Sequence, residues 1–267
     1  MARFHLPCAL KITGIMPENA TTKTFSLAGR LSADPGQFVM AWLPGFEDKP
    51  FSLAGTDPIS LTVAAVGPFS RAMHQLETGD ILWVRGPLGR GYHLPHAHDP
   101  AHLLLIGGGY GVAPLLFLAR RGVAAGHRVS MIIGARSSAD LLLAPAFEAL
   151  GSRVWLTTED GTAGQQGRVT DAISRVLAEP SPRPSHMYAC GPTGMLRAVA
   201  AQGVAATMSI QLAWEAHMRC GVGLCGSCEV GQGWLTCLDG PVFQADPVVV
   251  PPAQSPATKN ENAPYVA

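Results

Sequence analysis

The sequence shows no excess of either charge sign, because 19 Lys and Arg residues balance 19 Asp and Glu residues. A basic or acidic surplus is typical of proteins that bind nucleic acids or anionic membranes, so neither partner is indicated. The opening residues, Met-Ala-Arg-Phe-His-Leu-Pro-Cys, lack the long apolar stretch of a signal peptide. No apolar run reaches the ~20 residues that span a bilayer, and no internal repeat is evident. We therefore expect a cytoplasmic protein.

Apolar residues are plentiful. The 267 residues are 47% hydrophobic and only 14% charged, which describes a globular protein with ample core. A chain of this length can form one large domain or two to three small ones.

Cysteine is concentrated near the C-terminus. Four of the six cysteines follow the spacing C-x4-C-x2-C, then eight residues, then C, at Cys220, Cys225, Cys228 and Cys237. The opening triplet is the plant-type ferredoxin pattern for a [2Fe–2S] cluster. Gly221, Gly223 and Gly226 allow positive φ in a loop that must turn thiolates inward, and their N–H groups can bond to the sulfurs. The pattern predicts a [2Fe–2S] site at the four cysteines.

Three other readings of these cysteines compete, of which chance clustering of four of the six cysteines around glycines is the weakest. Structural zinc ribbons usually use two separated C-x2-C knuckles, and only Cys225 and Cys228 have that form. A disulfide framework suits small secreted domains rather than a long chain. The iron–sulfur reading is favoured, and zinc remains the alternative.

Up to about residue 95 the chain reads as short strands separated by Gly, Pro and Asp turns. This pattern predicts a β-barrel or sandwich with strands at Thr24–Leu27, Gln37–Trp42, Ser60–Ala65 and Ile81–Arg85. The following segment, 93–102, is rich in proline and histidine, and we expect a solvated inter-domain linker rather than a metal site.

From about residue 102 strands alternate with helices, which predicts a parallel sheet with helices on both faces. The expected strands are Leu103–Ile106, Arg128–Ile133, Val154–Thr158 and His186–Cys190. Helices are expected up to about Arg121, near Pro145–Leu150, at about Val169–Leu177 and at about Thr193–Ala201. We expect the stretch from about Pro251 to be disordered.

A glycine turn, Gly107–Gly111, follows the first of these strands and precedes a helix. In that context glycines let a phosphate approach the backbone and the helix N-terminus offers unpaired N–H groups. The turn departs from G-x-G-x-x-G, because Val112 takes the third glycine position. No acidic ribose ligand ends the second strand, where Arg136 and Ser137 stand. Taken alone, the turn is as compatible with a plain strand–helix connection as with a nucleotide site.

Cys190-Gly191-Pro192 also lies at a strand end before a helix. Both segments then face the carboxyl edge of the sheet, where ligands bind. A flat ring could lie over this strand end, although a buried core cysteine is a common alternative.

Together these motifs resemble the ferredoxin–NADP reductase superfamily. Gly107–Pro114 with Cys190-Gly-Pro is similar to its NAD(P) half, Lys49-Pro50-Phe51-Ser52 to its flavin motif, and the 86–92 segment to its Gly-Pro-x-Gly-x-Gly-Phe. With the cysteine loop after the nucleotide domain, the chain resembles the electron-transfer subunits of NAD-dependent two-subunit dihydroorotate dehydrogenases. The resemblance extends to about residue 245.

The resemblance implies three parts and a tail: an FAD-binding barrel at 1–97, an NAD(P)-binding α/β domain at 98–212, a [2Fe–2S] domain at 213–248 and a flexible segment at 249–267. It implies FAD contacts at Lys49, Pro50, Phe51, Ser52, Thr62, Val63, Ala64, Phe69 and Ser70. It implies NAD contacts at Gly107, Gly108, Gly109, Gly111, Ala113, Pro114, Cys190, Gly191 and Pro192. The implied partner is an FMN-containing dihydroorotate dehydrogenase catalytic subunit in a two-plus-two heterotetramer. No acid–base residue is required for hydride transfer.

Two positions depart from the family pattern. Lys49 stands where arginine is usual, which keeps the charge and loses the bidentate fork. Phe69-Ser70 stands where Gly-Thr is usual. Rival readings are the flavin subunits of sulfide dehydrogenases, hydrogenases or ferredoxin-dependent NADP reductases, and a non-enzymatic, zinc-stabilised adaptor. NADH is preferred over NADPH by resemblance, while Arg136 and Ser137 could accept a 2′-phosphate.

Overall fold

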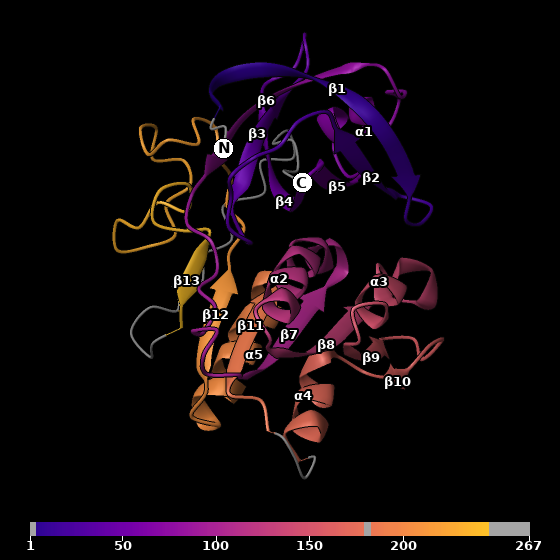
Figure 1. Ribbon diagram of the computed structural model, residues 1–267, viewed down its shortest axis with the longest axis vertical. Helices are drawn as coiled ribbons and strands as arrows, with labels where there is room; N and C mark the ends of the chain where they lie inside the picture. Colours follow the sequence, from indigo (N-terminus) through magenta and orange to yellow (C-terminus); the bar gives the residue numbers. More distant parts are fainter. Residues whose placement is uncertain (1–3, 179–182, 246–267) are drawn as a thin grey trace, which may run out of the picture. The chain divides into compact units, whose positions relative to one another are not determined.

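The computed structural model describes residues 4–178 and 183–245, which form two compact units (Figure 1). One unit holds the chain up to Arg90 together with Ala216–Pro241, which contains the four clustered cysteines. The other holds Gly91–Glu215 together with the strand Val242–Gln244. The tail predicted for 249–267 lies outside the described residues.

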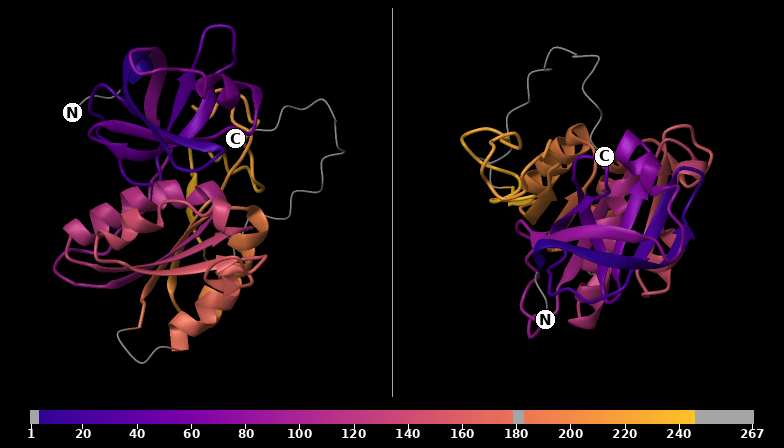
Figure 2. Two further views of the ribbon diagram at one scale, coloured as in Figure 1. Left: turned by 90° about the vertical axis from the view of Figure 1, so that its right-hand side faces the viewer. Right: turned by 90° about the horizontal axis from the view of Figure 1, so that it is seen from above.

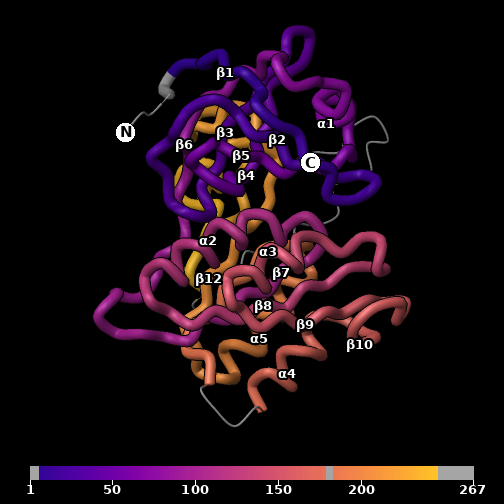
Figure 3. The backbone as a smooth tube through the Cα atoms, turned by 45° about the vertical axis from the view of Figure 1, so that its right-hand side comes forward, coloured from indigo at the N-terminus to yellow at the C-terminus, as the bar shows by residue number. Residues whose placement is uncertain are grey.

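The first unit is built around a closed barrel of six antiparallel strands (Figure 3). Its order is β1-β2-β5-β4-β3-β6, and the helix α1 (Pro68–Met73) follows β5. The strands are β1 (Phe4–Pro17), β2 (Thr22–Leu27), β3 (Phe38–Trp42), β4 (Lys49–Thr56), β5 (Ile59–Ala64) and β6 (Ile81–Leu88). The predicted barrel is confirmed, and the long first strand β1 is an addition.

The second unit is a seven-stranded sheet in the order β10-β9-β8-β7-β11-β12-β13. The first six in that list are parallel to their neighbours, and β13 pairs antiparallel with β12. The strands are β7 (His102–Gly108), β8 (Arg128–Ala135), β9 (Arg153–Thr158), β10 (Gln165–Gln166), β11 (His186–Cys190), β12 (Ser209–Ala213) and β13 (Val242–Gln244). The predicted parallel sheet is confirmed.

Helices cover both faces of this sheet (Figure 2, left). Two of them, α2 (Val112–Ala124) and α3 (Ala144–Glu148), contact each other, as do α4 (Val169–Ala178) and α5 (Thr193–Ala205). Two 3-10 turns, η1 (Gly109–Gly111) and η2 (Ser138–Asp140), follow β7 and β8. Because helices cover both faces, β7 and β8 are buried almost without a break. Among the described residues, no helix combines the length and apolarity needed to cross a bilayer.

One of the four histidines assigned to the solvated linker lies elsewhere. His102 is buried in β7, where its Nε2 shares a 2.8 Å hydrogen bond with Ser130 Oγ of β8. The prediction was wrong for this residue because a polar pair between neighbouring strands leaves no trace in the local sequence. His93, His96 and His98 precede the strand, as predicted.

Candidate functional site

The four clustered cysteines approach one another in two pairs. Cys228 Sγ and Cys237 Sγ are buried and 3.3 Å apart, and both are free thiols. Cys220 and Cys225 hydrogen-bond to each other through their side chains, and Cys225 is exposed. Within the described ranges no three His, Cys, Asp or Glu side chains converge as ligands of one metal ion. Two thiolate pairs fit a binuclear [2Fe–2S] cluster, in which each iron takes two protein ligands.

Backbone N–H groups of the cysteine loop point at three of the sulfurs, those of Cys220, Cys225 and Cys237. Cys220 Sγ accepts from Val222 N at 3.5 Å and from Leu224 N at 3.3 Å, and Cys237 Sγ accepts from Gly223 N at 3.2 Å. The three loop glycines have positive φ angles of 68°, 78° and 72° at Gly221, Gly223 and Gly226, as their sequence positions predicted. Such N–H···S bonds stabilise thiolate ligands and tune a cluster's potential.

The hydrogen bonds shift the thiol pKa values in the absence of a cluster. Hydrogen bonds from the hydroxyl and backbone of Ser227, whose Oγ lies 3.0 Å from Cys225 Sγ, lower the pKa of Cys225 to about 6. Burial raises the pKa of Cys220, but the N–H groups of the loop outweigh it and the net shift is downward. Burial and the neighbouring thiol of Cys228 raise the pKa of Cys237 to about 12. Cys220 and Cys225, the outer pair, therefore ionise more readily than Cys237, which with Cys228 forms the inner pair.

We expect iodoacetamide to alkylate Cys225 first when the cluster-free protein is treated at pH 7. Its side chain is exposed, and above its pKa of about 6 the thiolate is the main form, so the rate should fall as the pH drops through 6. Cys190 should stay unmodified because burial raises the pKa of its thiol. Mass spectrometry of peptides measures the order, and equal rates for the two cysteines would contradict it.

The cysteine loop packs against the barrel strand β3. Phe38 and Met40 of β3 form one buried cluster with Cys228, Cys237 and Met218. The same strand pairs with β4 so that Phe38 lies opposite Ser52 and Met40 opposite Pro50. One strand therefore separates the inner cysteine pair from the predicted flavin motif.

The predicted flavin residues lie on two neighbouring barrel strands and on α1. Lys49–Ser52 begin β4, and Thr62–Ala64 end β5, its partner strand. The ring of Phe69 in α1 has its centre 5.8 Å from that of Phe51 in β4. The structure therefore brings the three predicted segments together, while their contact with FAD stays a prediction.

Three polar side chains of this set already have partners in the protein. Thr62 Oγ1 shares a 2.8 Å hydrogen bond with Thr24 Oγ1. Lys49 Nζ lies 3.3 Å from Glu47 Oε2. The buried Ser70 hydroxyl accepts a hydrogen bond from Gly67 N at 2.9 Å and donates one to Gly67 O at 3.1 Å. Ser70 thus stabilises its own turn. The Lys49 ammonium is the charged group of the predicted set that suits a flavin phosphate.

The predicted nucleotide residues meet where the strand order of the sheet reverses. Gly107 of β7 lies in register with Cys190 of β11, and β8 and β12 continue the sheet in opposite directions. Ligands of open α/β sheets bind in the crevice at such a point. The segments Gly107–Gly111 and Cys190–Pro192 are therefore neighbours at the carboxyl edge, as predicted.

The glycine turn comes very close to β11. A Cβ on Gly111 would lie 2.5 Å from the Cys190 carbonyl oxygen, so no larger residue fits there. Gly109, with φ of 55°, has no other atom within 4 Å of its Cβ position, which leaves open space above the N-terminus of α2. Ala113 and Pro114 are buried in the first turn of that helix, so they shape the turn from behind. This cradle fits a pyrophosphate held by backbone N–H groups.

Two residues at this edge were not predicted. The Tyr110 hydroxyl in the glycine turn hydrogen-bonds to Glu215, and partial burial with the Glu215 charge raises the pKa of Tyr110 to about 12. Burial, followed by the charge of Glu215, raises the pKa of Cys190. Glu215 lies two residues after the last residue of β12, and its place just beyond the end of a parallel strand was the available signal.

Comparison with known proteins identifies two domains. Residues 105–201 match the family model of the oxidoreductase NAD-binding domain, and residues 215–249 match the iron–sulfur cluster binding domain of dihydroorotate dehydrogenase B. The chain is 40% identical over 227 residues to the probable dihydroorotate dehydrogenase B (NAD(+)) electron transfer subunit of Thermococcus kodakarensis, covering 85% of this chain and 91% of that protein. It is 36% identical to the Methanocaldococcus jannaschii protein of the same name, covering 90% of each.

Solved structures give a similar result. The NADH-dependent reduced ferredoxin–NADP oxidoreductase structure, described for flavin-based electron bifurcation, has a TM-score of 0.78 and 27% identity, covering 92% of this chain and 89% of that one. The ferredoxin reductase of carbazole 1,9a-dioxygenase has a TM-score of 0.66 and 18% identity, covering 78% of this chain and 68% of that one, and supports the fold alone.

Proposed function

This chain belongs to the family of dihydroorotate dehydrogenase B electron transfer subunits, and we propose that it carries electrons between a partner flavoprotein and NAD through a [2Fe–2S] cluster and FAD. The partner is the catalytic subunit that oxidises dihydroorotate in pyrimidine biosynthesis. The observation that carries the proposal is the packing of the paired cysteines on β3, the strand next to the predicted flavin motif.

When bound, the three groups supply the redox chemistry: NAD exchanges hydride, the cluster exchanges single electrons, and a flavin can do both. The chain's own residues position them. Lys49 supplies positive charge at the start of β4, and the N-terminus of α2 supplies N–H groups at the sheet edge. Buried Cys190 forms the wall of that edge as a neutral thiol, because burial raises its pKa.

β3 provides a short route between the two predicted electron sites of the barrel unit. One of its faces is covered by the cysteine loop, and its hydrogen bonds join it to β4. Phe38 and Met40 fill the space beside the inner cysteine pair, which excludes water there. A cluster held by these cysteines would be one strand away from the residues that we propose to hold the flavin.

Apolar side chains surround the outer cysteine pair. Val222, Leu224 and Leu238 are all exposed, and a Cβ on Gly223 would lie 3.0 Å from Leu238, so they belong to one surface. Exposed apolar surface of this kind commonly marks a protein interface. We assign it to an FMN-containing catalytic subunit in a two-plus-two assembly, within the cytoplasm, where thiols stay reduced.

Leu224→Glu should weaken this interface, because the Leu224 side chain is 84% exposed and a carboxylate in an apolar interface is costly. We expect partner-dependent turnover to fall on the order of tenfold or more, with the rate of flavin reduction by NADH unchanged. Leu6→Glu, at a position 79% exposed on β1, is the matched control. Equal loss in both variants would contradict the assignment.

We expect NADH to bleach the flavin absorbance of the isolated protein with no partner present. NADPH should react more slowly than NADH. The Ser137 hydroxyl, just after the end of β8, donates a 2.9 Å hydrogen bond to the exposed carboxylate of Asp140. At this place the negative charge of Asp140 would repel the 2′-phosphate of NADPH. Anaerobic stopped-flow spectroscopy measures both rates. Absence of bleaching by NADH would count against the proposed function, and a preference for NADPH would assign Arg136 to the phosphate instead.

A second candidate differs only in the partner. The likeness to an NADH-dependent ferredoxin–NADP oxidoreductase over 92% of this chain favours a ferredoxin-linked partner as the alternative. Copurification with a dihydroorotate-oxidising flavoprotein distinguishes the two.

A further inference from the structure

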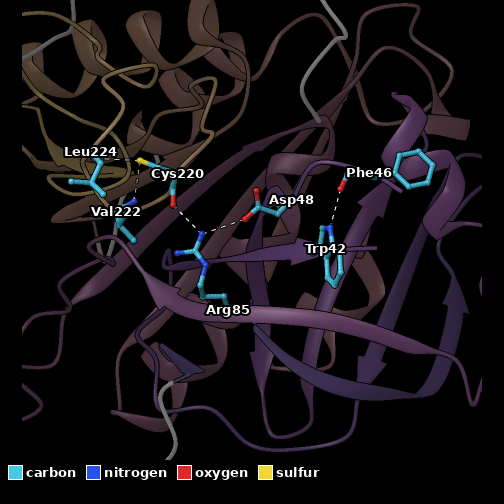
Figure 4. A network of polar contacts seen from close by, with 7 residues as sticks. All are labelled: Trp42, Phe46, Asp48, Arg85, Cys220, Val222 and Leu224. Atoms are coloured by element: carbon cyan, nitrogen blue, oxygen red, sulfur yellow. Dashed lines mark hydrogen bonds and ion pairs between the residues drawn. The ribbon is translucent and has the colours of Figure 1, made fainter. Parts of the chain in front are cut away.

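An arginine of the barrel holds the first cysteine of the loop (Figure 4). Arg85, on β6, has a side chain that is 16% exposed, and its Nη2 donates a 2.9 Å hydrogen bond to the backbone carbonyl of Cys220. The same nitrogen lies 3.3 Å from Asp48 Oδ2. A single guanidinium group therefore joins the cysteine loop to the segment that enters β4.

The contact defines how the loop starts. With the Cys220 carbonyl held by Arg85, the chain turns at Gly221, and the N–H groups of Val222 and Leu224 both point back to Cys220 Sγ (Figure 4). Arg85 therefore orients the backbone from which the first thiolate and its two N–H donors project.

The arginine is also linked to the flavin side of the barrel. Asp48 directly precedes Lys49, the first residue of the predicted flavin motif. Met40, opposite Arg85 in the β3–β6 register, packs beside the inner cysteine pair. Arg85 thus contacts both parts of the structure whose separation determines how well an electron passes between them.

A cation at this place has an electrostatic consequence. Reducing a [2Fe–2S] cluster adds one negative charge, and a nearby cation stabilises the reduced state, so it raises the midpoint potential. The charge is only partly screened because the arginine side chain is largely buried. Asp48 opposes the effect from the other side.

We propose that Arg85 is a positioning residue for the [2Fe–2S] cluster: it anchors Cys220 to the barrel and its charge raises the cluster's midpoint potential. The proposal rests on the proposed function, because it requires that the cysteines hold a cluster. An ion pair with a purely structural role would leave the potential unchanged.

Three variants and a control test the proposal in the full-length, cluster-loaded protein. Arg85→Met removes the charge and the hydrogen bond, Arg85→Lys keeps the charge with a single-point donor, and Asp48→Asn removes the opposing charge. Arg30→Met is the control, because Arg30 pairs with Asp57 on the barrel surface with both side chains well exposed. The readouts are the midpoint potential from an EPR-monitored titration and the rate of iron loss to a chelator.

We expect a more negative potential and iron loss on the order of tenfold faster for Arg85→Met. Arg85→Lys should keep the potential near that of the original protein but lose iron faster, and Asp48→Asn should shift the potential upward. The control should change neither. An unchanged potential and iron-loss rate in Arg85→Met, or a downward shift of equal size in Arg85→Lys, would overturn the proposal.

The same samples separate this inference from the proposed function. Reduction of the flavin by NADH in the unaltered protein, with a cluster present, supports the proposed function whatever the Arg85 variants do. An unaltered protein that binds no cluster would overturn both.

Discussion

Replacing Cys225 by alanine is expected to abolish the [2Fe–2S] cluster while the chain stays folded. Cys225 is one of the four proposed ligands, and the three remaining thiolates could not complete two four-coordinate irons. Because its side chain is exposed, alanine leaves no cavity in the core. The protein should lose its red-brown absorbance, and partner-dependent turnover should fall on the order of 100-fold or more.

Flavin reduction by NADH should survive this change, since the proposed nucleotide site lies in other elements of the chain, at the ends of β7 and β11. Cys8→Ala is the matched control, because Cys8 is a free cysteine of β1 outside the loop. Iron and acid-labile sulfide are measured in both variants together with circular dichroism. A Cys225→Ala protein that keeps the full iron and sulfide content would rule out Cys225 as a ligand.

Gly111→Ala should strongly impair the reaction with NADH. The added Cβ would lie 2.5 Å from the Cys190 carbonyl oxygen and 2.8 Å from Gly191 N, so the glycine turn and β11 must move apart. Displacing a binding site by about 1 Å can lower a rate on the order of 100-fold. We expect kcat/KM for NADH to fall by about that factor, with a stability loss of roughly 1–3 kcal/mol from the overpacking.

The cluster provides the internal reference for this variant. Its EPR signal after reduction by dithionite should match that of the original protein, because Gly111 lies in the sheet unit. Gly14→Ala in β1 is the control, since the nearest atom to its added Cβ is Ser26 Cβ at 3.9 Å. Unchanged NADH kinetics in Gly111→Ala would contradict the placement of the nucleotide site between β7 and β11, where the strand order reverses.

The sequence predicted those features that local patterns encode. The alternation of strands and helices from β7 to α5 and the barrel strands β2, β3, β5 and β6 were found within a few residues of their observed bounds. The cysteine spacing and the positive φ of the loop glycines were also readable, because one short loop carries the whole pattern.

Contacts between segments that lie far apart in the sequence could not be predicted from it. Arg85 occupies an outward position in the alternating pattern of β6, where a charged residue normally meets solvent, and only the cysteine loop 135 residues later makes it an internal contact. The hydroxyl of Ser70 could serve a phosphate or its own turn, and its sequence position does not distinguish these uses. The strand β13 pairs with β12 although the cysteine loop separates the two strands in the sequence, and no local periodicity predicts this pairing.

One signal was available and unused. β3 reads Phe-Val-Met-Ala-Trp, and its first four residues are all buried. A barrel strand exposed on its outer face would alternate apolar and polar residues. The continuous apolar run therefore indicates that another segment covers the barrel wall at β3, and the cysteine loop is that segment.

The most direct test of the electron relay is an EPR spectrum of the anaerobically prepared, isolated protein after addition of NADH. A relay from NAD through FAD to the paired cysteines predicts the signal of a reduced [2Fe–2S] cluster, appearing after the flavin bleaches. A protein that binds flavin and nucleotide but shows no iron–sulfur signal with either NADH or dithionite would contradict the account.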